Sequence, residues 1–196
     1  MVGNDLCGFS DPGFPSDWKR EQDIPQAKSL LKAAGYDGAP VTLVTADVAP
    51  GATAVAQAFA QQAATAGVKI NVSQVTTSTY ENGYGNWTFS QDDWYNEPYL
   101  ATASLAFLPG GAWNETHFND PQFTALYKAA NATIDPARLL EIKREMWAIN
   151  FNQGSWIIPV VNELVDVLGT HVQGLPKTAT GVALGGAQFD SAWIAR

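Results

Sequence analysis

The sequence predicts an α/β fold in which helices alternate with short β-strands. Three observations lead to this prediction. Apolar residues recur at helical spacing in several segments, β-branched residues cluster between those segments, and capping residues mark where helices begin. The chain has 196 residues, of which 46% are hydrophobic and 15% charged. This is enough apolar material for the core of one domain or one large lobe.

The first half of the chain contains two predicted helices around a strand. A helix is expected over residues 23–34, because Asp23 is a good N-cap residue and a periodic apolar face follows it. Residues 41–45 are rich in β-branched side chains and predict a strand. Residues 51–66 are rich in alanine and predict a second helix, which Gly67 would end.

Two further strands and a long helix are expected beyond this point. Residues 68–75 alternate apolar and polar side chains, which predicts a strand with one buried face. A helix over 135–151 begins with the N-cap signal Asp135 followed by proline, and Asp120 followed by Pro121 gives the same start signal for the helix before it. Residues 156–161 are apolar and contain Pro159, which is typical of an edge strand or of a strand that bends. The expected sheet combines residues 41–45, 68–75 and 156–161.

One segment, residues 87–114, is the strongest candidate for a binding site and is called the aromatic–acidic segment below. It combines three carboxylates with three tryptophans, and Pro98 excludes a continuous strand. Such loops often carry function, because aromatic side chains provide apolar walls and a few polar groups orient a ligand. The competing interpretation is a solvated turn beside core tryptophans. The candidate ligand-binding residues are Trp87, Asp92, Asp93, Trp94, Glu97, Trp113 and Asn114.

Composition excludes several classes of function. The net charge is −8 and the basic residues are scattered, which argues against nucleic-acid binding. Cys7 is the single cysteine, so no intrachain disulfide can form. The two histidines, His117 and His171, lack the spacing of a metal site, and neither a metal nor another cofactor is predicted. No apolar run approaches the roughly 18 residues that a transmembrane helix needs.

The first residues do not form a targeting signal. Residues 1–6 lack a basic region followed by an apolar core, so we do not expect a signal peptide there. Proline and glycine follow at Pro12, Gly13 and Pro15, which predicts extended connecting structure over residues 1–22. We therefore expect the chain to be a segment of a longer protein.

Three blocks of sequence carry a resemblance to a known family. Residues 23–36 resemble that family's helix ending in Ala-Gly-Tyr, and residues 66–72 resemble its strand that opens with Gly-Val. Residues 119–159 resemble its paired helices followed by Ile-Ile-Pro. In order and spacing, residues 20–165 look like the C-terminal portion of an extracytoplasmic solute-binding protein of family 5, the peptide-, nickel- or oligosaccharide-binding component of ABC importers.

The resemblance implies a fold and a division of the chain. Family members have two α/β lobes joined at a hinge, with the ligand enclosed between them. The chain is then expected to be a single lobe of a type II periplasmic-binding-protein fold, with a mixed sheet flanked by helices. Residues 1–161 would be the second, C-terminal lobe, and residues 162–196 would return to the missing first lobe.

The resemblance also implies a function. The full protein would capture a small solute, most simply a peptide or an oligosaccharide, and deliver it to an ABC permease. It would be a transport protein rather than an enzyme. It would act in the periplasm or at the cell surface, as a membrane-anchored lipoprotein. The surface that the missing lobe leaves bare would favour self-association of this chain.

Peptide-binding relatives hold the ligand's amino group with an aspartate beside a segment such as Asp-Pro or Glu-Pro. Residues 95–98 resemble that segment, but Trp94 stands where the aspartate is expected. The nearest carboxylates are Asp92 and Asp93. A tryptophan at this position suits stacking on a sugar or contact with a bulky apolar ligand equally well.

Two alternatives from other classes remain. A hydrolase would use paired carboxylates from Asp92, Asp93 and Glu97, as glycosidases do, but no second catalytic cluster and no Gly-x-Ser-x-Gly motif accompany them. Cys7 has no nearby histidine to activate it. A stand-alone interaction module would use apolar residues of the C-terminal segment, among them Leu164 and Trp193.

Overall fold

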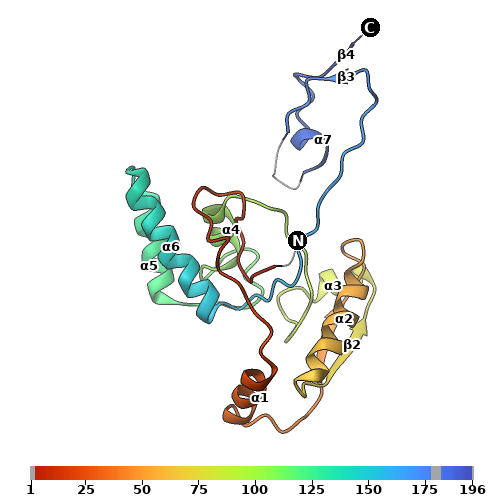
Figure 1. The fold of residues 1–196 in the computed structure, drawn as a ribbon, viewed down its shortest axis with the longest axis vertical. Coiled ribbons are helices and arrows are strands. Elements are labelled where there is room, and N and C mark those ends of the chain that lie inside the picture. Colours follow the sequence, from red (N-terminus) through yellow and green to blue (C-terminus); the bar gives the residue numbers. More distant parts are fainter. Residues whose placement is uncertain (1–2, 178–181, 196) are drawn as a thin grey trace. The chain divides into compact units, whose positions relative to one another are not determined.

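The computed structural model describes residues 3–177 and 182–195 and separates into two compact units (Figure 1). One unit comprises Glu21–Trp94 and is called the sheet unit. The other comprises Met1–Arg20 and Tyr95–Arg196 and is called the helical unit. Each unit is described by itself.

The sheet unit alternates helices and strands as the sequence predicts. Its elements are α1 (Ile24–Ala33), β1 (Val41–Thr45), α2 (Ala52–Thr65), β2 (Ile70–Gln74) and α3 (Thr77–Asn82). Asp23 caps α1 by accepting a hydrogen bond from the backbone N–H of Gln26 at 2.8 Å. On β2, Ile70 and Val72 are half-buried while Asn71 is exposed, which confirms the alternation but with a face that is only partly buried.

The strands of the sheet unit run parallel. β1 pairs with β2 in register from Val41 opposite Ile70 to Thr45 opposite Gln74. Ser90 forms an isolated parallel bridge with Val44. Val44 bonds to residues 89 and 91, whereas the ends of β1 bond to residues 69 and 75, so β1 lies between β2 and the segment around Ser90. Helix α2 runs beside these strands (Figure 1).

A small core forms beneath the ends of these strands. Val44, Ala46 and Tyr80 are buried together. Four half-buried side chains pack against them, namely Val48, Val75, Tyr84 and Trp87. Tyr84 and Trp87 are therefore part of the packing around the end of β1.

The helical unit is built around a pair of long helices. Its elements are α4 (Tyr99–Ala106), α5 (Pro121–Ala132), α6 (Pro136–Gln153), β3 (Val172–Gln173), α7 (Ala183–Gly186) and β4 (Trp193–Ile194). Helices α5 and α6 pack against each other (Figure 1). Each begins with an aspartate N-cap followed by proline, and the carboxylates of Asp120 and Asp135 accept bonds from Phe123 and Arg138. Both predicted helix starts are confirmed.

Aromatic side chains fill the core of the helical unit. Tyr99 of α4 stacks on Trp147 of α6 with ring centroids 4.6 Å apart, and both side chains are fully buried. The Tyr99 hydroxyl donates to Asn150, and the Trp147 indole N–H donates to the Cys7 carbonyl at 3.1 Å. Each buried polar end of these aromatics therefore has a partner.

The N-terminal segment is tied into this core although residues 3–22 contain no helix or strand. The carboxylate of Asp11 pairs with Lys143 of α6 and accepts the backbone N–H of Tyr99 at 3.2 Å. Gly8 has a φ of 77°, and a Cβ there would lie 2.7 Å from the Cβ of Tyr99. Only glycine satisfies both the backbone conformation and the close approach.

The prediction that residues 156–161 join the sheet is wrong. They belong to the helical unit, whereas β1 and β2 belong to the sheet unit. Pro159 lacks an N–H and cannot continue a ladder. Its carbonyl instead accepts a bond from Gly3 at 3.0 Å, and the N–H of Ile158 donates to Asp5 at 2.8 Å.

Helix α4 was not predicted, because the sequence pattern that marks amphipathic helices is missing there. The buried residues lie on one face of the helix, namely Tyr99, Thr102, Ala103 and Ala106. The other sides also carry apolar residues, namely Leu100, Ala101 and Leu105. A helix with apolar residues on all sides shows no contrast between its faces, so no apolar stripe stands out in the sequence.

The C-terminal region carries exposed apolar side chains. Val165 is 80% exposed and Val167 88% exposed. Beyond them, β3 pairs with β4 as a short antiparallel ladder. None of the helices in the described ranges has both the length and the apolar character required to cross a membrane.

Candidate ligand-binding site

Part of the aromatic–acidic segment leaves the sheet unit at the carboxyl end of its strands. Ser90 runs parallel to Val44, so the residues after Ser90 emerge at the edge where β1 and β2 also end. The hydroxyl of Thr45 donates to the side chain of Gln91 at 2.7 Å, which fixes the exit point. Open α/β sheets bind ligands at this edge, and Asp92, Asp93 and Trp94 follow directly.

Asp92 is the best-connected carboxylate at this edge. Its Oδ2 accepts the hydroxyl of Tyr84 at 3.2 Å and the indole N–H of Trp94 at 3.2 Å. Its Oδ1 accepts the backbone N–H of Asp93 at 2.8 Å. Burial raises the pKa of Asp92 above its ordinary value, and these hydrogen bonds oppose that shift. We call Tyr84, Asp92 and Trp94 the Asp92 network.

Asp93 differs from its neighbour in exposure and bonding. Its side chain is exposed, and partial burial raises its pKa. Within the described ranges its carboxylate accepts no hydrogen bond. A carboxylate of this kind is free to meet a ligand cation or hydroxyl group.

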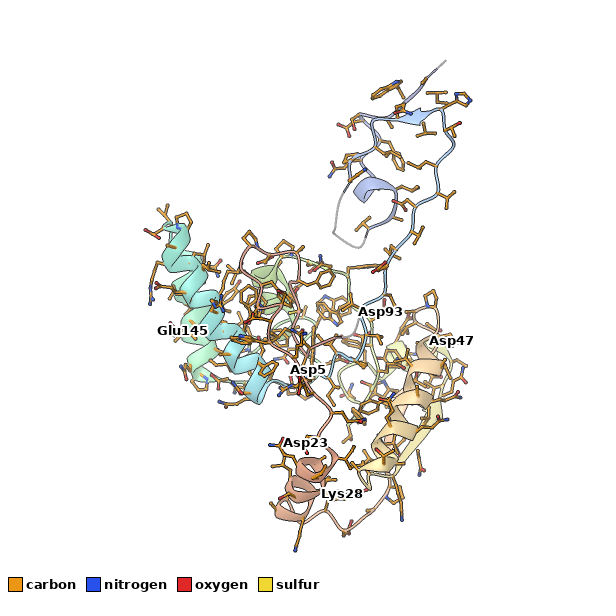
Figure 2. The ribbon with its side chains drawn as sticks, viewed as in Figure 1. Asp5, Asp23, Lys28, Asp47, Asp93 and Glu145 are labelled. Atoms are coloured by element: carbon orange, nitrogen blue, oxygen red, sulfur yellow. The ribbon has the colours of Figure 1, made fainter. Side chains whose placement is uncertain are left out.

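Asp47 is a residue at the same edge that the sequence analysis missed. It follows β1 by two residues, and its carboxylate accepts the hydroxyl of Thr53 at 3.0 Å and the amide of Gln74 at 3.3 Å. Figure 2 labels Asp47 and Asp93, the carboxylates that follow two of the parallel segments. An acidic residue between a predicted strand and the next helix was the signal that could have identified Asp47.

Trp87 packs inside the sheet unit. It lies against the small core, and its indole N–H donates to the carbonyl of Tyr80 at 3.1 Å. Its ring covers Gly83, where a Cβ would lie 2.2 Å from the ring. The structure therefore brings Trp87, Asp92, Asp93 and Trp94 into one unit, with Trp87 as a support.

The remaining three predicted site residues lie in the helical unit. The Asn114 amide donates to the carbonyls of Leu108 and Phe118 at 3.0 and 2.8 Å, so it organises its own loop. Trp113 beside it is 50% exposed, and Glu97 is half-buried. Nothing in these contacts tests whether Glu97, Trp113 and Asn114 touch a ligand, and their role stays a prediction.

The histidine, cysteine and acidic side chains of the described residues bear on two other kinds of site. No group of three or more histidine, cysteine or acidic side chains is arranged to hold a metal ion in that part of the chain. Burial raises the pKa of the Cys7 thiol to about 12. Cys7 is therefore protonated at neutral pH and is not a thiolate nucleophile.

With this geometry established, similarity to known proteins identifies the family. Residues 2–116 match the profile of the family described as bacterial extracellular solute-binding proteins, family 5 Middle. The chain belongs to this family. Family 5 solute-binding proteins are extracytoplasmic components of ABC importers, which confirms the resemblance inferred from the three sequence blocks. The family consists of transport-binding proteins and not of enzymes.

Solved structures of family members share the fold. The oligopeptide-binding protein AppA of Bacillus subtilis, in complex with a nonapeptide, superimposes with a TM-score of 0.71 at 15% identity over 100% of this chain and 43% of its own. The periplasmic binding protein DppA of Helicobacter pylori, in complex with the peptide STSA, superimposes with a TM-score of 0.69 at 19% identity. The match covers 95% of this chain and 38% of DppA. NikZ of Campylobacter jejuni, in complex with Ni(L-His), superimposes with a TM-score of 0.67 at 14% identity. The match covers 79% of this chain and 35% of NikZ.

These likenesses confirm the predicted fold class, a mixed α/β lobe of the periplasmic-binding-protein type. The chain spans less than half the length of each of the three solved relatives. No curated protein sequence matches it.

Proposed function

We propose that this chain is the second lobe of an ABC-transporter substrate-binding protein that captures a peptide or an oligosaccharide. One observation carries the proposal: in a chain of family 5, Asp92, Asp93 and Trp94 follow directly on the carboxyl ends of parallel strands. That is the edge at which open α/β sheets bind ligands.

Trp94 and Asp93 have the leading roles in this proposal. Trp94 is half-buried and offers an aromatic face for stacking on a ring or an apolar side chain. Asp93 is exposed and supplies a negative charge beside it. This pairing fits a ligand that presents one flat apolar face together with hydroxyl or ammonium donors. Trp87 supports the site from the core, and Glu97, Trp113 and Asn114 complete the proposed set from the sequence.

The division of the full protein follows the family's two-lobed plan. Residues 1–161 form the second lobe, and residues 162–196 return to a first lobe that lies outside this chain. The exposed side chains of Leu164, Val165 and Val167 support this assignment, because they are apolar and lack cover in this chain. The complete protein is a membrane-anchored lipoprotein that delivers its ligand to an ABC permease. This chain alone self-associates through the same bare surface.

Calorimetry with di- to pentapeptides and short oligosaccharides tests the proposal. Pockets bury about 70–90% of a ligand, and one lobe covers only part of that surface. We expect millimolar binding, because this chain makes part of the contacts but still loses the ligand's translational freedom. Trp94→Ala is expected to weaken that binding at least about tenfold, which is about 1.4 kcal/mol.

Trp193→Ala is a matched control, because Trp193 is 58% exposed and lies outside the proposed set. Its binding should equal that of the unmodified chain. Submicromolar binding by this chain would contradict the proposal that one lobe makes only part of the ligand contacts. Unchanged binding in both Trp94→Ala and Asp93→Ala would show that the ligand contacts another part of the lobe.

A further inference from the structure

Two aromatic side chains converge on a single oxygen atom of Asp92. Tyr84 and Trp94 are separated along the chain, yet the hydroxyl of one and the indole N–H of the other both donate to Oδ2 at 3.2 Å. A carboxylate oxygen has two lone pairs, so these two donors satisfy Oδ2. The backbone N–H of Asp93 takes one lone pair of Oδ1 at 2.8 Å.

These bonds connect Trp94 to a tyrosine that is anchored in the core. Tyr84 packs against the core of Val44, Ala46 and Tyr80, and its ring meets that of Tyr80 edge-on with centroids 6.4 Å apart. Tyr84 is therefore anchored. Trp94 is half-buried and is the last residue of the sheet unit, and Asp92 joins its indole to the anchored phenol.

The arrangement costs folding energy that simple packing would not require. Asp92 is half-buried, and a carboxylate withdrawn from water is unfavourable unless hydrogen bonds compensate it. Hydrogen bonds to an ionised acceptor are the strong, directional ones. They also fix the direction in which the Trp94 indole points, because an indole has a single N–H donor.

We propose that Asp92 is a positioning residue that holds the Trp94 indole in one orientation for the ligand and does not itself bind the ligand. The proposal rests on the proposed function for the role of Trp94. It changes the role of Asp92 from a direct polar contact to a support. It leaves Asp93, whose carboxylate accepts no hydrogen bond within the described ranges, as the charge that meets the ligand.

The first experiment needs no ligand. Proton–nitrogen correlation spectra of the chain resolve indole N–H signals, and Trp94→Phe identifies the signal of Trp94. In the unmodified chain we expect this signal to exchange slowly with deuterated water. In Asp92→Ala it should move and exchange faster, because the carboxylate that accepts the indole N–H is gone. In Asp92→Asn it should move less, because the amide oxygen still accepts the bond.

Asp93→Ala is the matched control, since it removes the neighbouring carboxylate while retaining the backbone N–H that bonds to Asp92. The Trp94 signal should stay in place in this variant. If Asp92→Ala does not fold, Asp92→Asn and Tyr84→Phe provide the test, and both should shift the signal in the same direction. An unmoved Trp94 signal in the folded Asp92 variants would overturn the proposal, as would an equal shift in Asp93→Ala.

The second experiment measures ligand affinity and separates the two proposals. With a ligand that loses affinity in Trp94→Ala, Asp92→Ala should weaken binding about tenfold, or about 1.4 kcal/mol, and Asp92→Asn should restore most of it. Equal losses in Asp92→Asn and Asp92→Ala would assign Asp92 a direct charge contact and overturn the positioning role. A shift of the Trp94 signal without binding of any tested solute would support the positioning and contradict the proposed function.

Discussion

Two aromatic clusters in this protein use the same hydrogen-bond chemistry in different surroundings. In the helical unit, Tyr99 and Trp147 stack in full burial, and a side-chain amide and a backbone carbonyl satisfy their polar ends. In the sheet unit, Tyr84 and Trp94 are half-buried, and the carboxylate of Asp92 satisfies both of them. The acceptors in the buried cluster of Tyr99 and Trp147 are neutral, whereas the acceptor in the half-buried cluster of Tyr84 and Trp94 is a carboxylate.

The difference separates a cluster that packs the core from the cluster for which we propose ligand binding. Neutral partners cost less to bury than a carboxylate, so the Trp147 cluster gains most of its stabilisation from the area it removes from water. The Asp92 network removes less apolar area and carries a charge that water would solvate better. Substitutions should therefore affect stability strongly in the first cluster and weakly in the second.

The largest effect is expected from Trp147→Ala. Trp147 is fully buried against Tyr99, and truncating a buried tryptophan costs about 3–5 kcal/mol of the free energy of unfolding. Urea denaturation followed by circular dichroism measures this change. Trp113→Ala is the control, since Trp113 is 50% exposed and surface substitutions stay within about 0.5 kcal/mol. Equal losses in the two variants would remove the distinction between buried and open aromatics.

A loss of similar or slightly smaller size is expected at the ion pair that ties the N-terminal segment to α6. Lys143 and Asp11 are about nine-tenths buried and 2.5 Å apart. Lys143→Met leaves Asp11 as a buried, unpaired charge, and breaking such a pair costs about 3 kcal/mol or more. Adding Asp11→Asn removes that charge while the amide oxygen can still accept the N–H of Tyr99.

The double variant should therefore be more stable than Lys143→Met alone, and urea denaturation of the four proteins of this cycle measures the coupling. Additive losses in the double variant would mean that the two groups do not depend on each other.

The sequence predicts the elements whose signals are local. Asp23, Asp120 and Asp135 mark helix starts that the structure confirms, because an N-cap acts within its own turn. Residues 156–161 were misplaced, because the choice between pairing with a sheet and pairing with the N-terminal segment depends on contacts distant in sequence. Helix α4 was missed, because apolar residues on all of its sides hide its period.

The candidate site was only partly predictable for the same reason. The concentration of aromatic and acidic residues identified Asp92, Asp93 and Trp94 as a group. It did not distinguish the roles that we propose for them, because these depend on the hydrogen bond from Tyr84 to Oδ2 of Asp92 and on the exposure of Asp93. Asp47 was missed because its position at the same edge follows from the parallel pairing of β1 with β2.

The smallest effect is expected in the pH dependence of the free energy of unfolding that Asp92 causes. It is also the most direct test of the charge in the Asp92 network. Burial raises its pKa from the ordinary value of 3.8 that the unfolded chain retains. Between 3.8 and the raised pKa, the folded chain binds more protons than the unfolded chain. The free energy of unfolding therefore falls as the pH rises through that window and is level above it. Asp92→Asn removes this titration.

The stability of Asp92→Asn relative to the unmodified chain should consequently grow as the pH rises through the window and then stay constant. Urea denaturation at a series of pH values measures this difference. Asp93→Asn is the matched comparison, because the pKa of Asp93 is also raised by burial although its side chain is exposed. Its stability difference should change in the same direction. A relative gain by the unmodified chain as Asp92 ionises would mean that the hydrogen bonds to its carboxylate outweigh the cost of burying it. The ionised Asp92 would then stabilise the fold rather than destabilise it.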